Sequence, residues 1–169
     1  VAETNVGKLR HSRVPFYRRN IGVVFQDFRL LPKMTVFENI AFALEVLALD
    51  KVTIRRRVRE ILELVSLQDK AKSFPDQLSG GQQQRATIAR AIANHPKVLI
   101  ADEPTGNLDP EKSMEIIELL DKINKVEGTT IVMVTHDSTL VNTYKKRTIA
   151  LEDGFIVADI AKGGYIHHD

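Results

Sequence analysis

The second half of the chain alternates short strand-like runs with one long helical segment, and this alternation constrains the fold most strongly. Residues 98–101 and 130–134 are aliphatic and β-branched runs of strand length. Residues 110–126 lie between them with helical spacing; Pro110 suits a first helical turn, and Gly128 suits a stop. Strands joined by a helix pair in parallel through a right-handed crossover. We therefore expect an α/β fold with a parallel core sheet.

The first half of the chain predicts one more strand and two helices. Residues 21–25 form a short apolar run that ends in polar Gln26, which is typical of a buried strand that delivers a loop to the sheet edge. Residues 35–49 and 53–65 carry apolar side chains near helical spacing, and the first segment opens with the Thr-x-x-Glu pattern of a capping box. We expect these two helices to form a small helical subdomain. A hairpin is expected at residues 147–151 and 155–160.

The composition favours one domain and excludes few functions. A chain of 169 residues that is 43% hydrophobic can bury one good core. A net charge of +2 gives no global field that would favour nucleic acid or an anionic membrane. The absence of cysteine excludes disulfides and thiolate metal sites. The most apolar run, residues 40–49, is far shorter than the ~20 residues of a membrane span. The start at Val1 has no leader pattern, so we interpret it as a cut edge.

Basic clusters occur at residues 10–13, 18–19 and 55–59. No aromatic residues are interleaved with them as in single-stranded nucleic-acid sites, so we interpret them as solvated faces or partner contacts, with no nucleic-acid partner. Four histidines lack a motif around them and are interpreted as surface residues: His11, His95, His167 and His168.

A helix start with the residues of a phosphate site lies at residues 78–82. Ser79 falls at the N-cap, and Gly80 and Gly81 let a ligand approach bare backbone amides. An isolated Ser-Gly-Gly start is also common in ordinary helices. The five-residue run with Gln-Gln-Gln-Arg behind it favours the phosphate site.

Two adjacent carboxylates, Asp102 and Glu103, follow the strand at residues 98–101, where ligands gather in open α/β sheets. Adjacent acids repel each other unless a cation is present. Asp102 can hold Mg²⁺ directly or through water, and Glu103 can act as general base towards an attacking water. Solvated acids at a strand end are the alternative, which the following residues 104–109 make improbable.

His136 follows the next strand in the same way, which places it at the sheet edge that Glu103 shares. An imidazole there can donate to a terminal phosphate and orient the water. By itself a lone histidine is more often a capping or packing residue, so the value of His136 comes from its position.

The motifs follow one order along the chain: Gln26, residues 78–82, 98–103 and 107–109, and His136. In this order they resemble the Q-loop, signature, Walker B, D-loop and H-loop of ATP-binding cassette (ABC) ATPases, over almost the whole chain. The resemblance implies the nucleotide-binding domain of an ABC-type P-loop NTPase, with ATP and Mg²⁺ as cofactors and ATP hydrolysis as the activity.

Such domains form head-to-tail dimers in which the signature of one protomer contacts the ATP of the other. The resemblance therefore implies that Ser79 and Gly81 act on the partner's nucleotide. The implied catalytic residues are Glu103, His136 and Gln26; the implied nucleotide-binding residues are Ser79, Gly80, Gly81, Gln82 and Asp109; the implied Mg²⁺ ligands are Asp102 and Gln26.

Residues 18–32, 41–46 and 163–165 resemble the FtsE family of cell-division ATPases within this superfamily. This implies a peripheral subunit on the cytoplasmic face of the cell membrane, paired with an FtsX-like integral membrane protein and regulating cell-wall hydrolysis. Phe28 and Leu30 resemble part of the surface that receives the coupling helix of the membrane protein. Lipoprotein-release and macrolide-export ATPases share the Leu-Leu-Pro element and are the alternatives.

One family motif does not occur in residues 1–169, because no segment matches the Gly-x-x-x-x-Gly-Lys-Ser/Thr phosphate loop. We therefore expect a single domain that is truncated at its N-terminus and is inactive as this fragment alone. Its expected parts are a core remnant at residues 1–31, the helical subdomain at 32–77 and the remaining motifs with the hairpin at 78–169. A catalytically dead binding module is the alternative.

A chromosome-maintenance or DNA-repair ATPase of the same superfamily is a third interpretation. That class has a long coiled coil between the Q-loop and the signature, whereas here one small helical subdomain separates Gln26 from Leu78. The spacing favours the transporter class.

Overall fold

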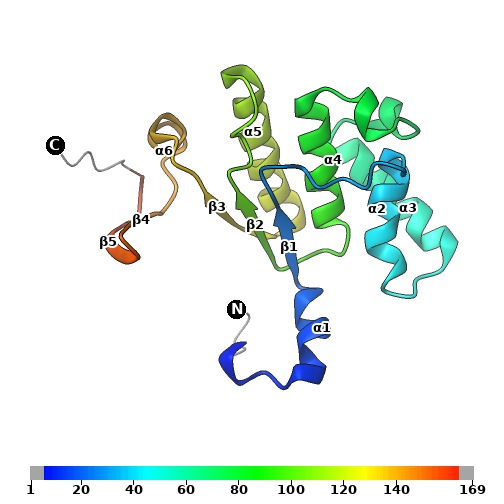
Figure 1. The fold of residues 1–169 in the computed structure, drawn as a ribbon, viewed down its shortest axis with the longest axis horizontal. Helices are drawn as coiled ribbons and strands as arrows, with labels where there is room; N and C mark the ends of the chain where they lie inside the picture. The colour runs from blue at the N-terminus through cyan, green and yellow to red at the C-terminus, as the bar shows by residue number, and fades with distance from the viewer. Residues whose placement is uncertain (1–5, 164–169) are drawn as a thin grey trace. The chain divides into compact units, whose positions relative to one another are not determined.

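The computed structural model describes residues 6–163, which form two compact units; the first ends at Val134 and the second begins at Thr135. Residues 164 and 165 of the family resemblance, with His167 and His168, lie outside the described residues. The first unit contains, in chain order, the short 3₁₀ helices η1 (Val6–Lys8) and η2 (His11–Arg13), then α1 (Val14–Arg18), β1 (Ile21–Val24), α2 (Val36–Glu45), α3 (Lys51–Leu64), η3 (Gln68–Lys70), η4 (Pro75–Gln77), α4 (Gly80–Ile92), β2 (Val98–Asp102), α5 (Pro110–Glu127) and β3 (Thr130–Val134) (Figure 1).

The core of the first unit is a three-stranded parallel sheet in the order β1-β2-β3. Val24 pairs with Ala101, and Ala101 pairs with Met133, so the carboxyl ends of all three strands lie at one edge. The predicted α/β class and the parallel pairing are confirmed. Because β2 is the central strand and pairs with β1, the residues that follow β2 lie beside the chain that leaves β1.

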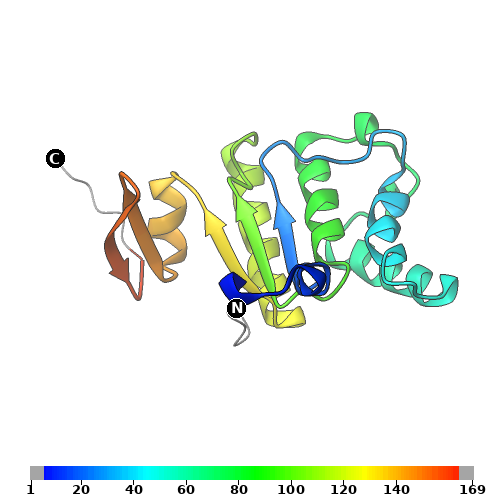
Figure 2. The same ribbon diagram turned by 60° about the horizontal axis from the view of Figure 1, so that its bottom comes forward.

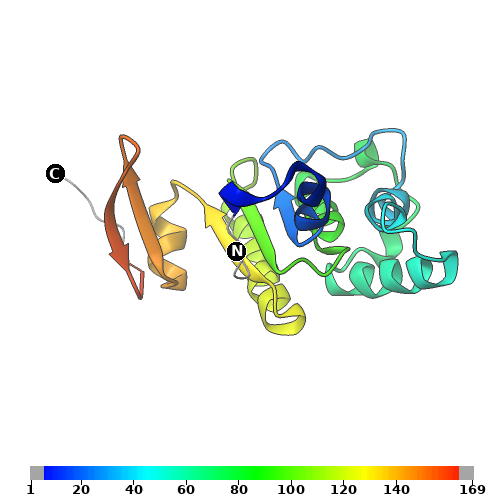
Figure 3. The same cartoon turned by 90° about the horizontal axis from the view of Figure 1, so that it is seen from below.

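Helices α4 and α5 lie side by side on one face of this sheet (Figures 2 and 3). The backbones of β1 and α4 are unusually close at Gly22, where an added Cβ would lie 2.4 Å from the Ala91 carbonyl oxygen. The largest fully buried side chains between these layers are Val24, Leu99, Ile88, Ile92, Ile116 and Ile123. On the opposite face one register row, Val23, Ile100 and Val132, is exposed.

The two predicted helices of the first half are α2 and α3, and α2 packs on both α3 and α4. Thr35 and Glu38 form the predicted capping box at the start of α2. The boundaries differ from the prediction: α2 ends at Glu45 because the chain turns through Ala48, whose φ is 56°. Helix α3 begins two residues early because the Asp50 carboxylate accepts from the amides of Val52 and Thr53.

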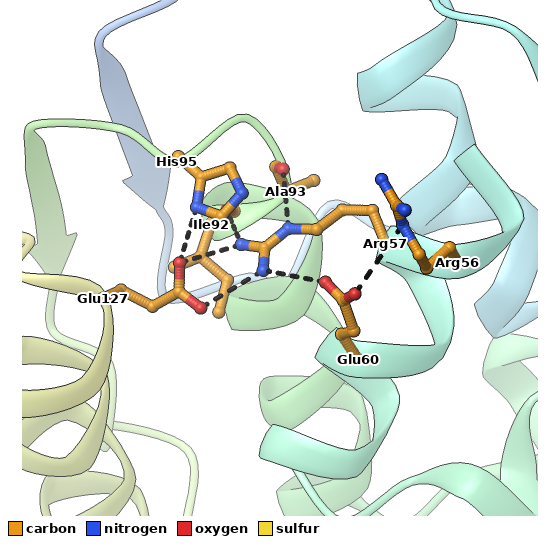
Figure 4. A network of polar contacts seen from close by, with 7 residues as sticks. All are labelled: Arg56, Arg57, Glu60, Ile92, Ala93, His95 and Glu127. Atoms are coloured by element: carbon orange, nitrogen blue, oxygen red, sulfur yellow. Dashed lines mark hydrogen bonds and ion pairs between the residues drawn. The ribbon is translucent and has the colours of Figure 1, made fainter. Parts of the chain in front are cut away.

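One residue of the basic cluster at 55–59 is not on a solvated face, so the prediction was wrong there. Arg57 is only 8% exposed, and its guanidinium bonds the Glu127 carboxylate of α5 at 2.9 Å and the Ile92 and Ala93 carbonyls at the end of α4 (Figure 4). His95 is exposed as predicted, but its Nδ1 lies 2.7 Å from Glu127. These contacts join α3, α4 and α5.

The second unit contains α6 (Ser138–Tyr144) and an antiparallel hairpin of β4 (Thr148–Glu152) and β5 (Phe155–Ile160). The predicted hairpin is confirmed, with a two-residue turn in which Asp153 (φ 48°) and Gly154 (φ 82°) are both left-handed. Such a turn matches the twist of the strands. Helix α6 was not predicted; the Asp137 carboxylate caps it. Among residues 6–163, no helix has both the length and the apolar character to cross a bilayer.

Candidate functional site

The loop after the central strand holds the two predicted carboxylates. Asp102 is the last residue of β2, pairs with Val134 and is exposed. Glu103 is half-buried, and its amide donates to the Val134 carbonyl oxygen at 2.9 Å. The backbone of Glu103 is left-handed, with φ 45°, immediately before Pro104. A non-glycine residue in this conformation is uncommon and is often found at functional sites.

The loop after β1 contacts the loop after β2. The Asn107 side-chain amide donates to the Gln26 carbonyl oxygen at 2.9 Å. The Gln26 side chain lies over Gly106, where an added Cβ would approach its Nε2 to 2.8 Å. The structure therefore brings Gln26 together with residues 103–107, as expected for strand ends at one sheet edge.

The residues after Gln26 form a tight turn with two further left-handed positions, Phe28 (φ 56°) and Arg29 (φ 51°). Inside the turn, Arg29 bonds the Asp27 carboxylate at 2.9 Å and lies 4.0 Å from the centre of the Phe25 ring. Helix α4 holds the same turn from outside, because Arg90 donates to the Arg29 carbonyl oxygen at 2.7 Å. Desolvation in this place lowers the pKa of Arg90 below its ordinary value.

The predicted phosphate-type helix start lies at the beginning of α4. Ser79 is its N-cap: the hydroxyl accepts from the Gln82 amide at 3.3 Å, and the Gln82 side chain accepts from the Ser79 amide at 3.0 Å. The amides of Gly80 and Gly81 are in the first helical turn, where amides have no partner within the helix. The Lys112 stem packs at 3.5 Å from an ideal Cβ position on Gly81. The predicted position of Ser79 at the N-cap is confirmed.

Charges beside this helix start come from α5. A hydrogen bond to Glu115 raises the pKa of Lys112, and the same bond, with one from Arg85, lowers the pKa of Glu115. Asp109 is the N-cap of α5 and accepts from the Lys112 amide at 2.9 Å. The structure therefore gives Asp109 a structural role, while its predicted contact with a nucleotide stays a prediction.

His136 belongs to the second unit, just before the Asp137 cap of α6. Its predicted position beside Glu103 stays a prediction. The part of β3 that leads to it ends at Val134, level with Asp102.

The donor set available for a cation consists of hard oxygen atoms, the Asp102 carboxylate and the Gln26 amide, which suit Mg²⁺. Within the described ranges, no group of three or more His, Cys, Asp or Glu side chains could hold a metal ion. Mg²⁺ in nucleotide sites usually takes one or two protein ligands together with phosphate and water.

Sequence reasoning missed three polar residues of α4, Gln84, Thr87 and Arg90, which contact both loops. The available signal was their spacing of three residues on a helix whose other inward positions are alanine and isoleucine.

The family model described as "ABC transporter" matches residues 3–106. The chain belongs to the ABC transporter family. It is 58% identical over 165 residues to the cell division ATP-binding protein FtsE of Bacillus subtilis, covering 98% of this chain and 72% of that protein. It is 57% identical over 169 residues to FtsE of Streptococcus pneumoniae strain D39, covering 100% of this chain and 73% of that protein.

A solved structure of the dimeric ATP-binding cassette MJ0796, in a post-hydrolysis state bound to ADP and Pi, has the same fold. It aligns with a TM-score of 0.82 and 37% identity over 98% of this chain and 73% of that one. The chain is thus an ABC ATPase of the FtsE type, and ATP hydrolysis is the activity of its family.

Proposed function

We propose that this chain is the ATP-binding and ATP-hydrolysing part of an FtsE–FtsX-type complex that regulates cell-wall hydrolysis during bacterial division. The FtsE relatives are named as cell division ATP-binding proteins, and they support this assignment at 57–58% identity. The subunit would lie at the cytoplasmic face of the cell membrane and pair with an FtsX-like integral membrane protein. No nucleic-acid partner is proposed.

The observation that carries the proposal is the contact between the Gln26 loop and the loop of Glu103 and Asn107. We assign Glu103 to polarise the attacking water as general base. We assign Gln26 and His136 to orient that water and the terminal phosphate. Asp102 and Gln26 would hold Mg²⁺, which supplies charge stabilisation to the phosphates when it is bound.

The nucleotide would be shared between two protomers arranged head to tail; the dimeric cassette MJ0796 supports a dimer. The first-turn amides of α4 would then face the partner's ATP, which suits an anion because they carry the positive end of the helix dipole. The residues proposed to contact nucleotide in this way are Ser79, Gly80, Gly81, Gln82 and Asp109.

We propose that both compact units belong to one nucleotide-binding domain, in which residues 32–77 are the helical subdomain. An ATPase of a lipoprotein-release or macrolide-export transporter is the second candidate. The spacing of one small helical subdomain between Gln26 and Leu78 fits both.

Replacement of Glu103 by Gln in the full-length gene product tests the catalytic assignment. The variant should bind ATP, stop turnover and accumulate as a dimer, which gel filtration with ATP measures. Glu103→Asp is the matched control, because it keeps the carboxylate. A Glu103→Gln variant that hydrolyses ATP at the normal rate would refute the assignment. Co-purification with an FtsX-like protein, compared with a lipoprotein-release permease, separates the two candidates.

A further inference from the structure

Three polar residues of α4 bond backbone carbonyls in the two loops of the candidate site. Gln84, Thr87 and Arg90 are spaced three residues apart, so they lie along one side of the helix. The same helix begins at Ser79, the predicted contact to a partner's nucleotide. One helix, α4, therefore connects Ser79 to the loops of Gln26 and Glu103.

Thr87 and Arg90, at the C-terminal end of this row of three side chains, hold the turn after Gln26. Arg90 Nη1 donates to the Arg29 carbonyl oxygen at 2.7 Å, and Nη2 lies 3.4 Å from the Phe28 carbonyl oxygen. The Thr87 hydroxyl lies 3.0 Å from the same Phe28 oxygen and 2.9 Å from the carbonyl of Gln83. Phe28 and Arg29 are both left-handed, a conformation that persists only where surrounding contacts fix it.

The start of the row holds the loop after β2. Gln84 Nε2 donates to the Pro104 carbonyl oxygen at 2.7 Å, one residue after left-handed Glu103. Gln84 is 1% exposed, and within the described part of the chain its Oε1 is buried without a partner. A half-satisfied buried amide costs stability that an apolar side chain of this size would not. The Pro104 bond, rather than core packing, explains the glutamine.

We propose that Gln84, Thr87 and Arg90 are positioning residues that hold the loops of Gln26 and Glu103 in register with the signature end of α4. A movement of α4 on contact with a partner's nucleotide would then displace both loops of its own site together. The link between nucleotide sites rests on the proposed function. The positioning of the loops does not, so the two are tested separately.

The positioning is tested by amide hydrogen exchange in residues 1–169. Thr87→Val and Arg90→Met should raise exchange at residues 27–30 about tenfold, the loss of roughly one hydrogen bond. Gln84→Met should do the same at residues 103–106. Arg57→Met is the matched control: Arg57 also bonds α4, at the Ile92 and Ala93 carbonyls, but contacts neither loop. Because Arg57→Met lowers the stability of the whole protein, exchange in the two loops is compared in every variant with exchange in the core strand β2 of the same variant. Unchanged exchange in both loops of the three variants overturns the proposal, as does equal loosening by Arg57→Met.

The catalytic consequence is tested in the full-length gene product. Thr87→Val and Arg90→Met should lower kcat about tenfold or more while KM for ATP changes little, because misplaced groups slow the chemistry more than binding. Arg90→Lys should recover part of kcat, since an ammonium reaches one carbonyl where the guanidinium fork reaches two. Arg57→Met should keep kcat below its melting temperature. Wild-type kcat in both Thr87→Val and Arg90→Met overturns the catalytic role. If Arg90→Met does not fold, the isosteric variant Thr87→Val decides it.

Absence of ATP hydrolysis by the wild-type protein refutes the proposed function instead, while the exchange result still decides the positioning.

Discussion

The Asn107 side chain donates a hydrogen bond to the Gln26 carbonyl oxygen at 2.9 Å, across 81 positions of sequence. The bond ties the segment after β1 to the segment after β2 at the edge where both strands end. Because the tie is to a backbone oxygen, it fixes where the Gln26 side chain starts and leaves that side chain available to a ligand.

A methyl group at Gly106 should affect activity more than stability. In Gly106→Ala the new Cβ would meet the far end of the Gln26 side chain at 2.8 Å, and a flexible side chain can move away. We expect a free energy of unfolding within about 1 kcal/mol of wild type and reduced ATP hydrolysis in the full-length gene product. Gly22→Ala is the matched control, because its Cβ would meet the backbone oxygen of Ala91 at 2.4 Å. We expect it to lower the free energy of unfolding by about 3 kcal/mol. Equal destabilisation by the two would contradict this, and urea unfolding compares them.

Removal of Arg57 should destabilise the protein strongly. The Arg57 and Glu127 side chains are only 10% and 9% exposed, so Arg57→Met leaves the Glu127 carboxylate in a poorly solvated place without its guanidinium partner, although His95 still contacts it. The expected loss is about 3–5 kcal/mol in urea unfolding. The double variant Arg57→Met/Glu127→Gln should recover part of it. Arg56→Met, which removes only an exposed pair with Glu60 at 4.0 Å, should cost less than about 0.5 kcal/mol.

The same pair predicts how stability depends on pH. Burial raises the pKa of Glu127, but the bonds from Arg57 and His95 outweigh burial and hold the pKa below its ordinary value of 4.5. A carboxyl with a lower pKa in the folded state stabilises the fold above its unfolded pKa, and this stability is lost as the pH falls through the folded value. Melting curves from about pH 6 down to pH 3 should therefore show a shallower acid loss for Glu127→Gln than for wild type. Parallel curves would show that Glu127 does not contribute.

Replacement of Ser79 should separate its capping role from its proposed nucleotide role. Ser79→Ala removes the acceptor for the Gln82 amide and should cost about 1 kcal/mol of stability. Ser79→Asp can restore the cap, but it places a negative charge where phosphate is proposed to bind. We expect Ser79→Asp to recover stability in urea unfolding while the full-length gene product loses ATP hydrolysis. Normal hydrolysis by Ser79→Asp would argue against phosphate at this helix start.

Nucleotide should stabilise residues 1–169 very little by themselves, because no phosphate loop motif occurs among them. A ligand raises the melting temperature only as far as it binds the folded state. We expect a shift below about 1 °C with millimolar Mg-ATP in differential scanning fluorimetry. The Arg57→Met variant, with its lower melting temperature, serves as a sensitive second sample. A large upward shift would contradict the expectation.

Features that depend on neighbouring residues in sequence could be predicted, and those that depend on distant packing could not. The Thr35 and Ser79 caps follow from a hydroxyl and a partner three residues later, and both are present. The parallel pairing of β2 and β3 follows from the helix between them, whereas the strand order was not predicted. Arg57 was misjudged because its burial comes from the ends of α4 and α5, up to 70 positions away.

Backbone conformation at the candidate site was also beyond the sequence pattern. Phe28, Arg29 and Glu103 are left-handed although their side chains disfavour that region. Contacts from α4 and β3 fix these positions, and no local motif announces them. Helix α6 was missed because it is only seven residues long and consists mostly of weak helix formers, namely serine, threonine, valine, asparagine and tyrosine.

The bonds from α4 to the turn after Gln26 can form only after α4 has been synthesised. Thr87 and Arg90, which bond the Phe28 carbonyl oxygen, follow Phe28 in the sequence by 59 and 62 positions. At translation rates of about 5–20 residues per second, the turn leaves the ribosome several seconds before Thr87 and Arg90 do. A nascent chain therefore passes through an interval in which β1 and the Gln26 loop are made but cannot be held, and slower translation of α4 would lengthen that exposure.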